Sequence, residues 1–302
     1  MLETTKQRLN NNVFTLPKFC IVTLLTLVMF IWGSLADFSV SKQLYIEWNR
    51  QNAGHILSVY FSIPGWFITC LLGWNVIFSG YKIKNDAKWA CVLGFITGII
   101  AVGGGGYGQY GCYHTLDSIY GSTWDLVNAL VLTIASFLGA FFLSFYGFRK
   151  IEAKQLFKVC FAALIAMAMV GLLGELGKNM FCRPRPNYVF EQSKPLEAFK
   201  NWYEPLWFSN FSATHKSFPS GHTVTASYAI IGICAISKLD LFKKKYVNNC
   251  LLFVAIATTL VVAFARIIAG KHWLTDVSGA LGIGIIVCYF TFVIEEKIRA
   301  IA

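Results

Sequence analysis

Eight apolar segments, most of them close to the length of a membrane-crossing helix, constrain this chain more than any other feature. The chain is 56% hydrophobic and only 14% charged, whereas soluble domains carry about 25% charged residues. A helix needs about 20 apolar residues to cross the hydrocarbon core of a bilayer. We therefore predict an all-α fold, a polytopic membrane bundle of about eight transmembrane helices. The predicted segments are roughly 17–36, 55–79, 89–105, 124–147, 157–177, 222–237, 248–266 and 277–295.

Lys and Arg are distributed as expected for a membrane protein. With the N-terminus in the cytoplasm, every segment on that side is basic, and this side holds more Lys and Arg than the other. The positive-inside rule requires this bias, so it accounts for the net charge of +11. No basic recognition helix or nucleic-acid motif accompanies the charge, and we expect no nucleic-acid partner. Ser34-Leu35-Ala36 resembles a signal-peptide cleavage site, but the long apolar stretch before it favours an uncleaved anchor.

Two further features carry weaker signals. The nine cysteines include no Cys-x-x-Cys pair, so a zinc site is not indicated. Cys112 and Cys182 are expected on the same non-cytoplasmic side, and the sequence leaves open whether they pair. The run from Gly103 to Gly108 lacks the Gly-Lys-Ser/Thr of a nucleotide P-loop. We interpret it as a flexible loop at a helix end.

Three polar segments interrupt the apolar pattern in the second half of the chain. They are 178–186 (KNMFCRPRP), 219–222 (PSGH) and 266–276 (RIIAGKHWLTD). In the predicted topology Lys178 follows the fifth apolar segment, His222 opens the sixth, Arg266 closes the seventh and Asp276 precedes the eighth. All four positions are on the non-cytoplasmic side and at one membrane depth. The sequence therefore predicts that they form one site.

Two histidines and one carboxylate supply the reactive groups of this predicted site. His272 and Asp276 are four residues apart and would share one face if the segment is helical. A carboxylate bonded to one ring nitrogen fixes the tautomer of an imidazole and frees the other nitrogen to attack. His222 would protonate a leaving oxygen as general acid. Ser220 and Gly221 precede it where a helix start offers free amide groups to an anion.

Three cations complete the set. Lys178, Arg185 and Arg266 would neutralise the oxygens of a phosphoryl group, the main catalytic device in phosphoryl transfer. Each cation alone is also explained as ordinary flanking charge, and each His or Asp alone as an interfacial side chain or a helix cap. The combination, in this order and on one side, indicates a phosphate site. The role of Arg183, next to the motif Arg185, is left open.

The pattern Lys-x6-Arg-Pro, Pro-Ser-Gly-His and Arg-x5-His-x3-Asp resembles that of the type 2 phosphatidic acid phosphatase (PAP2) superfamily of membrane lipid phosphatases. The resemblance covers about residues 89–295. It implies a six-helix catalytic domain within 89–302, preceded in 1–88 by a cytoplasmic tail and two additional transmembrane helices. One position departs from the family pattern, because Ala265 stands where the family has a phosphate-binding Ser.

The resemblance also implies the role of each site residue. His272 would be the nucleophile, Asp276 its orienting partner and His222 the general acid, and the reaction would pass through a phosphohistidine without metal or cofactor. The residues implied to bind phosphate are Lys178, Arg185, Ser220, Gly221 and Arg266.

We therefore expect an integral membrane enzyme that hydrolyses a lipid phosphomonoester or pyrophosphate. The expected substrates are of the undecaprenyl pyrophosphate, phosphatidylglycerophosphate or lipid A type, and the expected location is a bacterial inner membrane with the site facing the periplasm. The aromatic-rich segment 187–218 suits the entrance of such a site or a structural belt. A lipid phosphotransferase using the same phosphohistidine, or a non-catalytic transporter or scaffold, is the alternative. The sequence indicates neither the lipid nor the oligomeric state.

Overall fold

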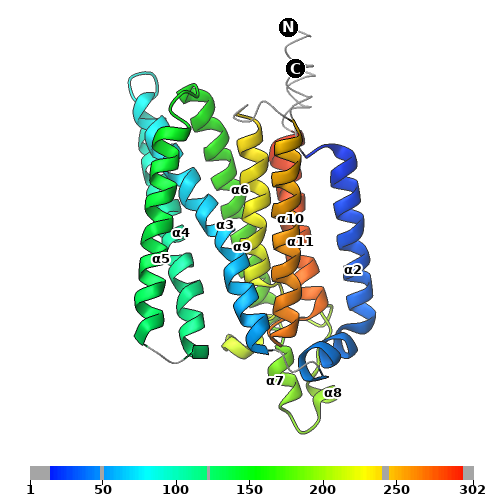
Figure 1. The fold of residues 1–302 in the computed structure, drawn as a ribbon. Helices are drawn as coiled ribbons and strands as arrows, with labels where there is room; N and C mark the ends of the chain where they lie inside the picture. Colours follow the sequence, from blue (N-terminus) through cyan, green and yellow to red (C-terminus); the bar gives the residue numbers. More distant parts are fainter. Residues whose placement is uncertain (1–13, 48–50, 121–122, 240–244, 295–302) are drawn as a thin grey trace.

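The computed structural model describes residues 14–47, 51–120, 123–239 and 245–294, and these form a helical bundle without strands (Figure 1). Each predicted apolar segment corresponds to one long helix. Within the described residues, short π-helical segments directly follow three of the α-helices. They are Gln43–Glu47, Leu143–Gly147 and Phe290–Ile294. The long helices are α2 (Leu16–Lys42), α3 (Gln51–Lys82), α4 (Lys88–Tyr120), α5 (Thr123–Phe142), α6 (Ala153–Phe181), α9 (Gly221–Ser237), α10 (Lys245–Ile268) and α11 (Leu274–Tyr289).

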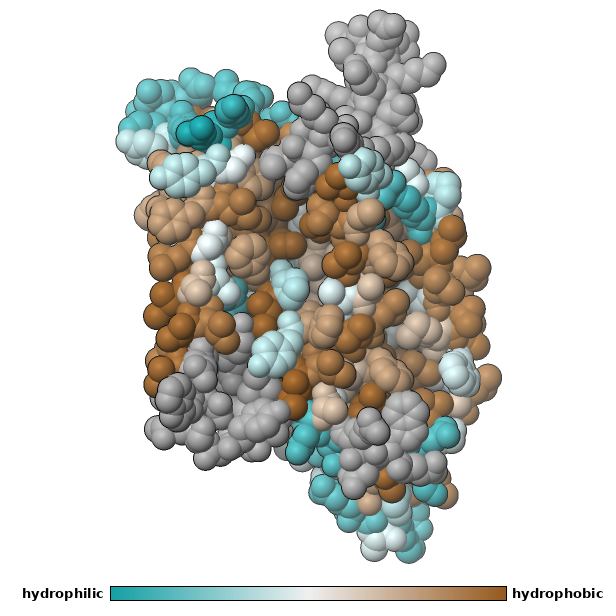
Figure 2. Space-filling model, in the orientation of Figure 1, coloured by the Kyte–Doolittle hydropathy of each residue, from teal (hydrophilic) through white to brown (hydrophobic). Residues whose placement is uncertain are grey.

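The surface of the bundle is that of a membrane protein. Seven of the described helices are long and apolar enough to cross a bilayer, and α9 is a shorter apolar helix of 17 residues. Figure 2 shows a broad hydrophobic belt between two hydrophilic ends. Leu, Ile, Val and Phe side chains are exposed over this belt, as expected of a surface that faces lipid tails. The predicted all-α polytopic membrane bundle is confirmed.

Helix α9 is the centre of the bundle. It packs against α3, α6, α10 and α11, and most of its residues are buried, including Ile230 and Ile231. A helix that is apolar on every face is stable only when it is enclosed by other elements. The first turn of α9, which carries Gly221 and His222, is therefore held in place by its neighbours.

The glycine run between Gly103 and Gly108 lies inside α4, so the predicted loop is wrong. Glycines in this part of α4 allow the helix to approach α3 closely. A Cβ on Gly105 would lie 2.6 Å from Cys70 Sγ and 2.9 Å from the carbonyl oxygen of Trp66. Small residues commonly permit such close contact between membrane helices.

The helix ends that carry the three motifs meet at one end of the bundle, at the bottom of Figure 1. The end of α6 and the starts of α9 and α11 lie there, together with the end of α10. The segment between α6 and α9 covers this end and contains the short helices α7 (Pro186–Phe190) and α8 (Pro195–Ala198) and a 3₁₀ turn, Ala213–His215. In this segment Cys182 is buried and its thiol donates to the carbonyl of Asn179 at 3.0 Å. The side chain of Cys112 lies outside the described part of the structure, so their pairing is untested.

The contact between α3 and α9 yields a test of this packing. A Cβ on Gly65 would lie 2.0 Å from the carbonyl oxygen of Thr225, so Gly65→Ala forces the two helices apart. We expect the free energy of unfolding to fall by about 1–3 kcal/mol, measured as a lower unfolding temperature in detergent. Gly104→Ala on α4 is the matched control, because a Cβ there meets nothing within 4 Å. Equal losses in both variants would contradict the packing.

Candidate active site

The structure brings the predicted site residues together from six places in the chain. Lys178 lies in the last turn of α6, and Arg185 is the residue before α7. Arg266 lies in the last turn of α10. The other predicted residues are Ser220 at the N-cap of α9, Gly221 and His222 in its first turn, His272 in the turn before α11, and Asp276 in the first turn of α11.

The three cations converge on the two histidines. A Cβ on Gly221 would lie 2.7 Å from Lys178 Nζ, so glycine leaves room for the ammonium group at the start of α9. Burial lowers the pKa of His272 well below its usual value, and the charges of Arg266 and Arg185 lower this pKa further. The imidazole is therefore neutral at ordinary pH, the form in which a ring nitrogen is able to attack.

A backbone carbonyl, and not the predicted carboxylate, fixes the ring of His272. Its Nδ1 lies 2.6 Å from the carbonyl oxygen of Ser217. A carbonyl only accepts hydrogen bonds, so Nδ1 carries the proton and Nε2 keeps its lone pair. The nearest oxygen of Asp276 is 3.8 Å from Nδ1, too far for a hydrogen bond but close enough for its charge to stabilise an imidazolium.

His272 and Asp276 would share a face only if the segment between them were helical, and it is not helical at His272. The backbone at Gly270 has a φ of +65°, a left-handed conformation that glycine adopts readily and that ends α10. Trp273 then acts as the N-cap of α11, so His272 lies outside the helix. This turn, rather than helical spacing, sets the distance between the two side chains.

The carboxylate of Asp276 is held by donors on both oxygens. Oδ2 accepts from the backbone N–H of Trp273 at 2.8 Å and from Ser217 Oγ at 2.5 Å. Oδ1 accepts from Arg183 Nη1 at 2.7 Å. Asp276 thus satisfies an orphan amide at the start of α11 and also holds Ser217, whose carbonyl oxygen orients His272.

Residues outside the predicted set also reach the site. Arg266 Nη1 donates to Ser58 Oγ on α3 at 3.3 Å, and Arg183 also pairs with Asp37 on α2 at 3.0 Å. Ionisable side chains are costly in a membrane interior and commonly mark function. A carboxylate directly after an apolar segment, as at Asp37, is a sequence signal that could have pointed to this contact. A single Ser58 within α3 gives no such signal.

Helix α3 packs closely against α10 at Ala265, the position where the family pattern has a Ser. Ala265 is buried, and a Cβ on Gly54 of α3 would lie 2.7 Å from its carbonyl oxygen. The same stretch of α3 carries Ser58, whose hydroxyl contacts Arg266. A hydroxyl group is therefore present beside this arginine, although it comes from another helix.

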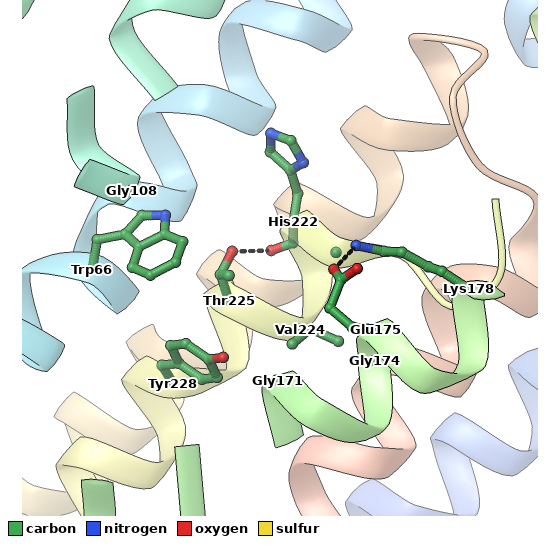
Figure 3. Close-up of a pocket in the computed structure, with 11 residues that line it drawn as sticks. Trp66, Gly108, Gly171, Gly174, Glu175, Lys178, His222, Val224, Thr225 and Tyr228 are labelled. Atoms are coloured by element: carbon green, nitrogen blue, oxygen red, sulfur yellow. Dashed lines mark hydrogen bonds and ion pairs between the residues drawn. The ribbon is translucent and has the colours of Figure 1, made fainter. Parts of the chain in front are cut away.

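A cavity of about 450 Å³ adjoins the first turn of α9 (Figure 3). Lys178 and Glu175 form an ion pair at one side of it, near His222 in Figure 3, and Lys178 also lies against Gly221. The rest of the wall is mostly apolar or lacks side chains. It is formed by Trp66, Gly108, Gly171, Gly174, Val224, Thr225 and Tyr228. The cavity thus joins a charged end to a largely apolar wall.

Comparisons with known proteins point to one superfamily. Residues 155–300 match the model of the PAP2 superfamily. Phosphatidylglycerophosphatase B of Bacillus subtilis (strain 168) is 26% identical over 108 residues, which cover 34% of this chain and 52% of that protein. The match thus spans about half the length of the relative. No solved structure matches the chain. Both findings support a lipid phosphatase as the general class.

The lowered pKa of His272 predicts how stability depends on pH. Below the ordinary histidine pKa of about 6.5, the unfolded chain binds a proton that the folded chain does not. The free energy of unfolding should therefore decrease as the pH falls from about 7.5 to about 5.5, by up to about 1.4 kcal/mol per pH unit from this residue. His272→Gln should make the dependence shallower in detergent unfolding measurements. An unchanged slope in the variant would contradict a neutral, buried His272.

Proposed function

We propose, from the PAP2 superfamily match of residues 155–300, that the protein is an integral membrane phosphatase acting on a lipid phosphomonoester or pyrophosphate. The observation that carries the proposal is the position of His272. Its Nδ1 faces the Ser217 carbonyl oxygen, and the charges of Arg266, Arg185 and Lys178 act on its ring. A neutral nucleophile surrounded by three cations suits attack on a phosphate.

In the proposed first step, Nε2 of His272 attacks the phosphorus atom. A nitrogen–phosphorus bond forms while the bond from phosphorus to the leaving oxygen breaks, and His222 gives that oxygen a proton. Asp276 stabilises the positive charge that develops on the ring, because its Oδ2 lies 3.8 Å from Nδ1. Lys178, Arg185 and Arg266 neutralise the phosphoryl oxygens in the transition state.

In the second step, water attacks the phosphohistidine and His222 accepts the proton. The nitrogen–phosphorus bond breaks, inorganic phosphate leaves and His272 returns to its neutral form. Ser220 and Gly221 place the amide groups at the N-terminus of α9 toward the phosphate. Within residues 14–47, 51–120, 123–239 and 245–294, no group of three His, Cys, Asp or Glu residues is arranged to hold a metal. We therefore assign charge stabilisation to the three cations.

We further propose that the site faces the non-cytoplasmic side of a bacterial inner membrane, toward the periplasm. The motifs lie at the end of the bundle opposite the connection from α3 to α4, which carries Lys82, Lys84 and Lys88 (Figure 1). A basic loop is expected in the cytoplasm. The headgroup would enter from the outer leaflet, with the lipid tail against the apolar wall of the cavity.

Phosphate release tests the proposal directly. The detergent-purified protein should release phosphate from at least one of undecaprenyl pyrophosphate, phosphatidylglycerophosphate and lipid A in excess chelator. His272→Ala should lower the rate at least about 10³-fold, because the nucleophile is lost. His215→Ala is the matched control, since this ring contacts Ser212, Thr214 and Tyr188, none of which is a proposed catalytic or phosphate-binding residue. Release that requires a divalent metal, or that survives in His272→Ala, would refute the mechanism.

The cavity predicts discrimination by tail length. Gly174 on α6 lines the apolar part of the wall, where an added Cβ would lie 3.3 Å from Val224 Cγ2, so Gly174→Leu should reduce the space between α6 and α9 there. We expect kcat/KM to fall about tenfold or more for long-chain lipid phosphates and little for a short water-soluble phosphate ester. Gly103→Leu, where an added Cβ meets nothing within 4 Å, is the control. Equal loss for both substrates would argue against a tail in this cavity.

A further inference from the structure

A buried arginine joins the first described helix to the proposed catalytic carboxylate. Arg183 Nη2 lies 3.0 Å from Asp37 Oδ2, and its Nη1 lies 2.7 Å from Asp276 Oδ1. The three side chains are at most 4% exposed. The guanidinium carbon also lies 5.6 Å and 5.3 Å from the ring centres of Phe199 and Trp273. Such a group is costly to bury unless its charge is matched.

Asp37 contacts the residue next to Asp276 as well. The backbone N–H of Thr275 donates to Asp37 Oδ1 at 3.0 Å, and the Thr275 hydroxyl donates to Oδ2. Arg183, the Thr275 N–H and the Thr275 hydroxyl all donate to the Asp37 carboxylate, as an ionised carboxylate requires. Packing supports the contact, because a Cβ on Gly33 would lie 2.9 Å from Thr275 Cγ2. Helix α2 therefore positions the first turn of α11.

The charges of this group do not cancel. Two carboxylates face one guanidinium, so the three side chains together carry one negative charge. That charge is presented to His272 through Asp276 Oδ2, at 3.8 Å from Nδ1. Without the charge of Asp37, the guanidinium would offset Asp276 alone, and the negative potential at the imidazole would decrease.

We propose that Asp37 is a positioning residue that acts through Arg183 to fix Asp276 and to preserve a net negative charge beside His272. The proposal rests on the proposed role of His272 as nucleophile. It adds α2, which lies outside the matched residues 155–300, to the parts of the chain that catalysis requires.

A purely structural role would give a different result. If Asp37 only fastened α2 to the bundle, its loss would lower stability and activity without a directed effect on the protonation of His272. The other charged or titratable groups acting on the site from neighbouring elements remain the same in every variant below, so only the charge of the network changes. These groups are Lys178 and Glu175 on α6, Arg185 before α7, His222 on α9, Arg266 on α10, Lys271 in the turn before α11 and His55 on α3.

Two single variants change the network charge in opposite directions, and a double variant restores it. Asp37→Asn brings it from minus one to zero, and Arg183→Gln brings it to minus two. The double variant restores minus one. The protonation of His272 is followed by NMR of histidine-labelled protein in detergent with saturating inorganic phosphate, whose charge offsets the three cations. His272→Ala assigns the signal.

We expect the His272 pKa to fall in Asp37→Asn, because the imidazolium loses a neighbouring negative charge. It should rise in Arg183→Gln and return close to the wild-type value in the double variant. Each shift should be on the order of one pH unit. The acid side of the kcat profile should move in the same directions. Asp37→Asn should lower kcat about 10- to 100-fold, the range found when partners that orient reacting groups are lost, with KM little changed.

Asp86→Asn is the matched control, because Asp86 pairs with Lys154 in an exposed ion pair at 3.0 Å, on the loop that joins α3 to α4. It should leave the His272 pKa and kcat unchanged. Asp37→Glu keeps the charge and replaces Asp37→Asn in the test if that variant does not fold. It should lower kcat without changing the His272 pKa. Shifts of the same sign in Asp37→Asn and Arg183→Gln, or no shift in either, would overturn the proposal. The titration needs no turnover, so its result remains separate from failure of the proposed phosphatase activity.

Discussion

The carboxylate of Asp276 is the group on which the arrangement of the site depends. One oxygen caps the start of α11 and binds the Ser217 hydroxyl, and the other binds the buried Arg183. The carbonyl oxygen of Ser217 in turn orients His272. Because these contacts are buried, a lost partner is not replaced by water and the remaining group stays unpaired. One side chain thereby links the position of a helix, a loop and the proposed nucleophile.

The membrane setting explains why so few polar residues suffice. Helices satisfy their own backbone groups in lipid, so polar side chains are left to gather where helix ends meet. At that end the chain collects positive charge from Lys178, Arg185 and Arg266 around His272 and His222, and buried charges of this kind act strongly on a phosphate. The adjoining cavity, with Lys178 at one side and Trp66 and Tyr228 in its wall, suits a molecule that is charged at one end and apolar at the other.

The helices were predictable because a membrane-crossing segment is set by length and hydropathy alone. Successive segments cross the membrane in alternating directions, and this placed Lys178, His222, Arg266 and Asp276 at one depth. Local geometry was harder to predict. The left-handed backbone at Gly270 ends α10 and places His272 in the turn before α11, so helical spacing does not apply to His272 and Asp276. The glycine run in α4 packs against α3 and is not a loop, because composition does not reveal which neighbour is close. Asp37 meets Arg183 and Thr275, which are 146 and 238 residues away in the sequence, and no spacing rule indicates such pairs. The catalytic roles themselves remain predictions.

The most direct test of the account is whether a phosphoryl group resides on His272 during turnover. The protein would be mixed with a radiolabelled lipid phosphate, quenched in alkali, in which phosphohistidine is stable, and digested for mass spectrometry. We expect an acid-labile phosphate on the peptide that contains His272, present in His215→Ala and absent in His272→Ala. Turnover without any covalent phosphate, or with the phosphate on another residue, would contradict it.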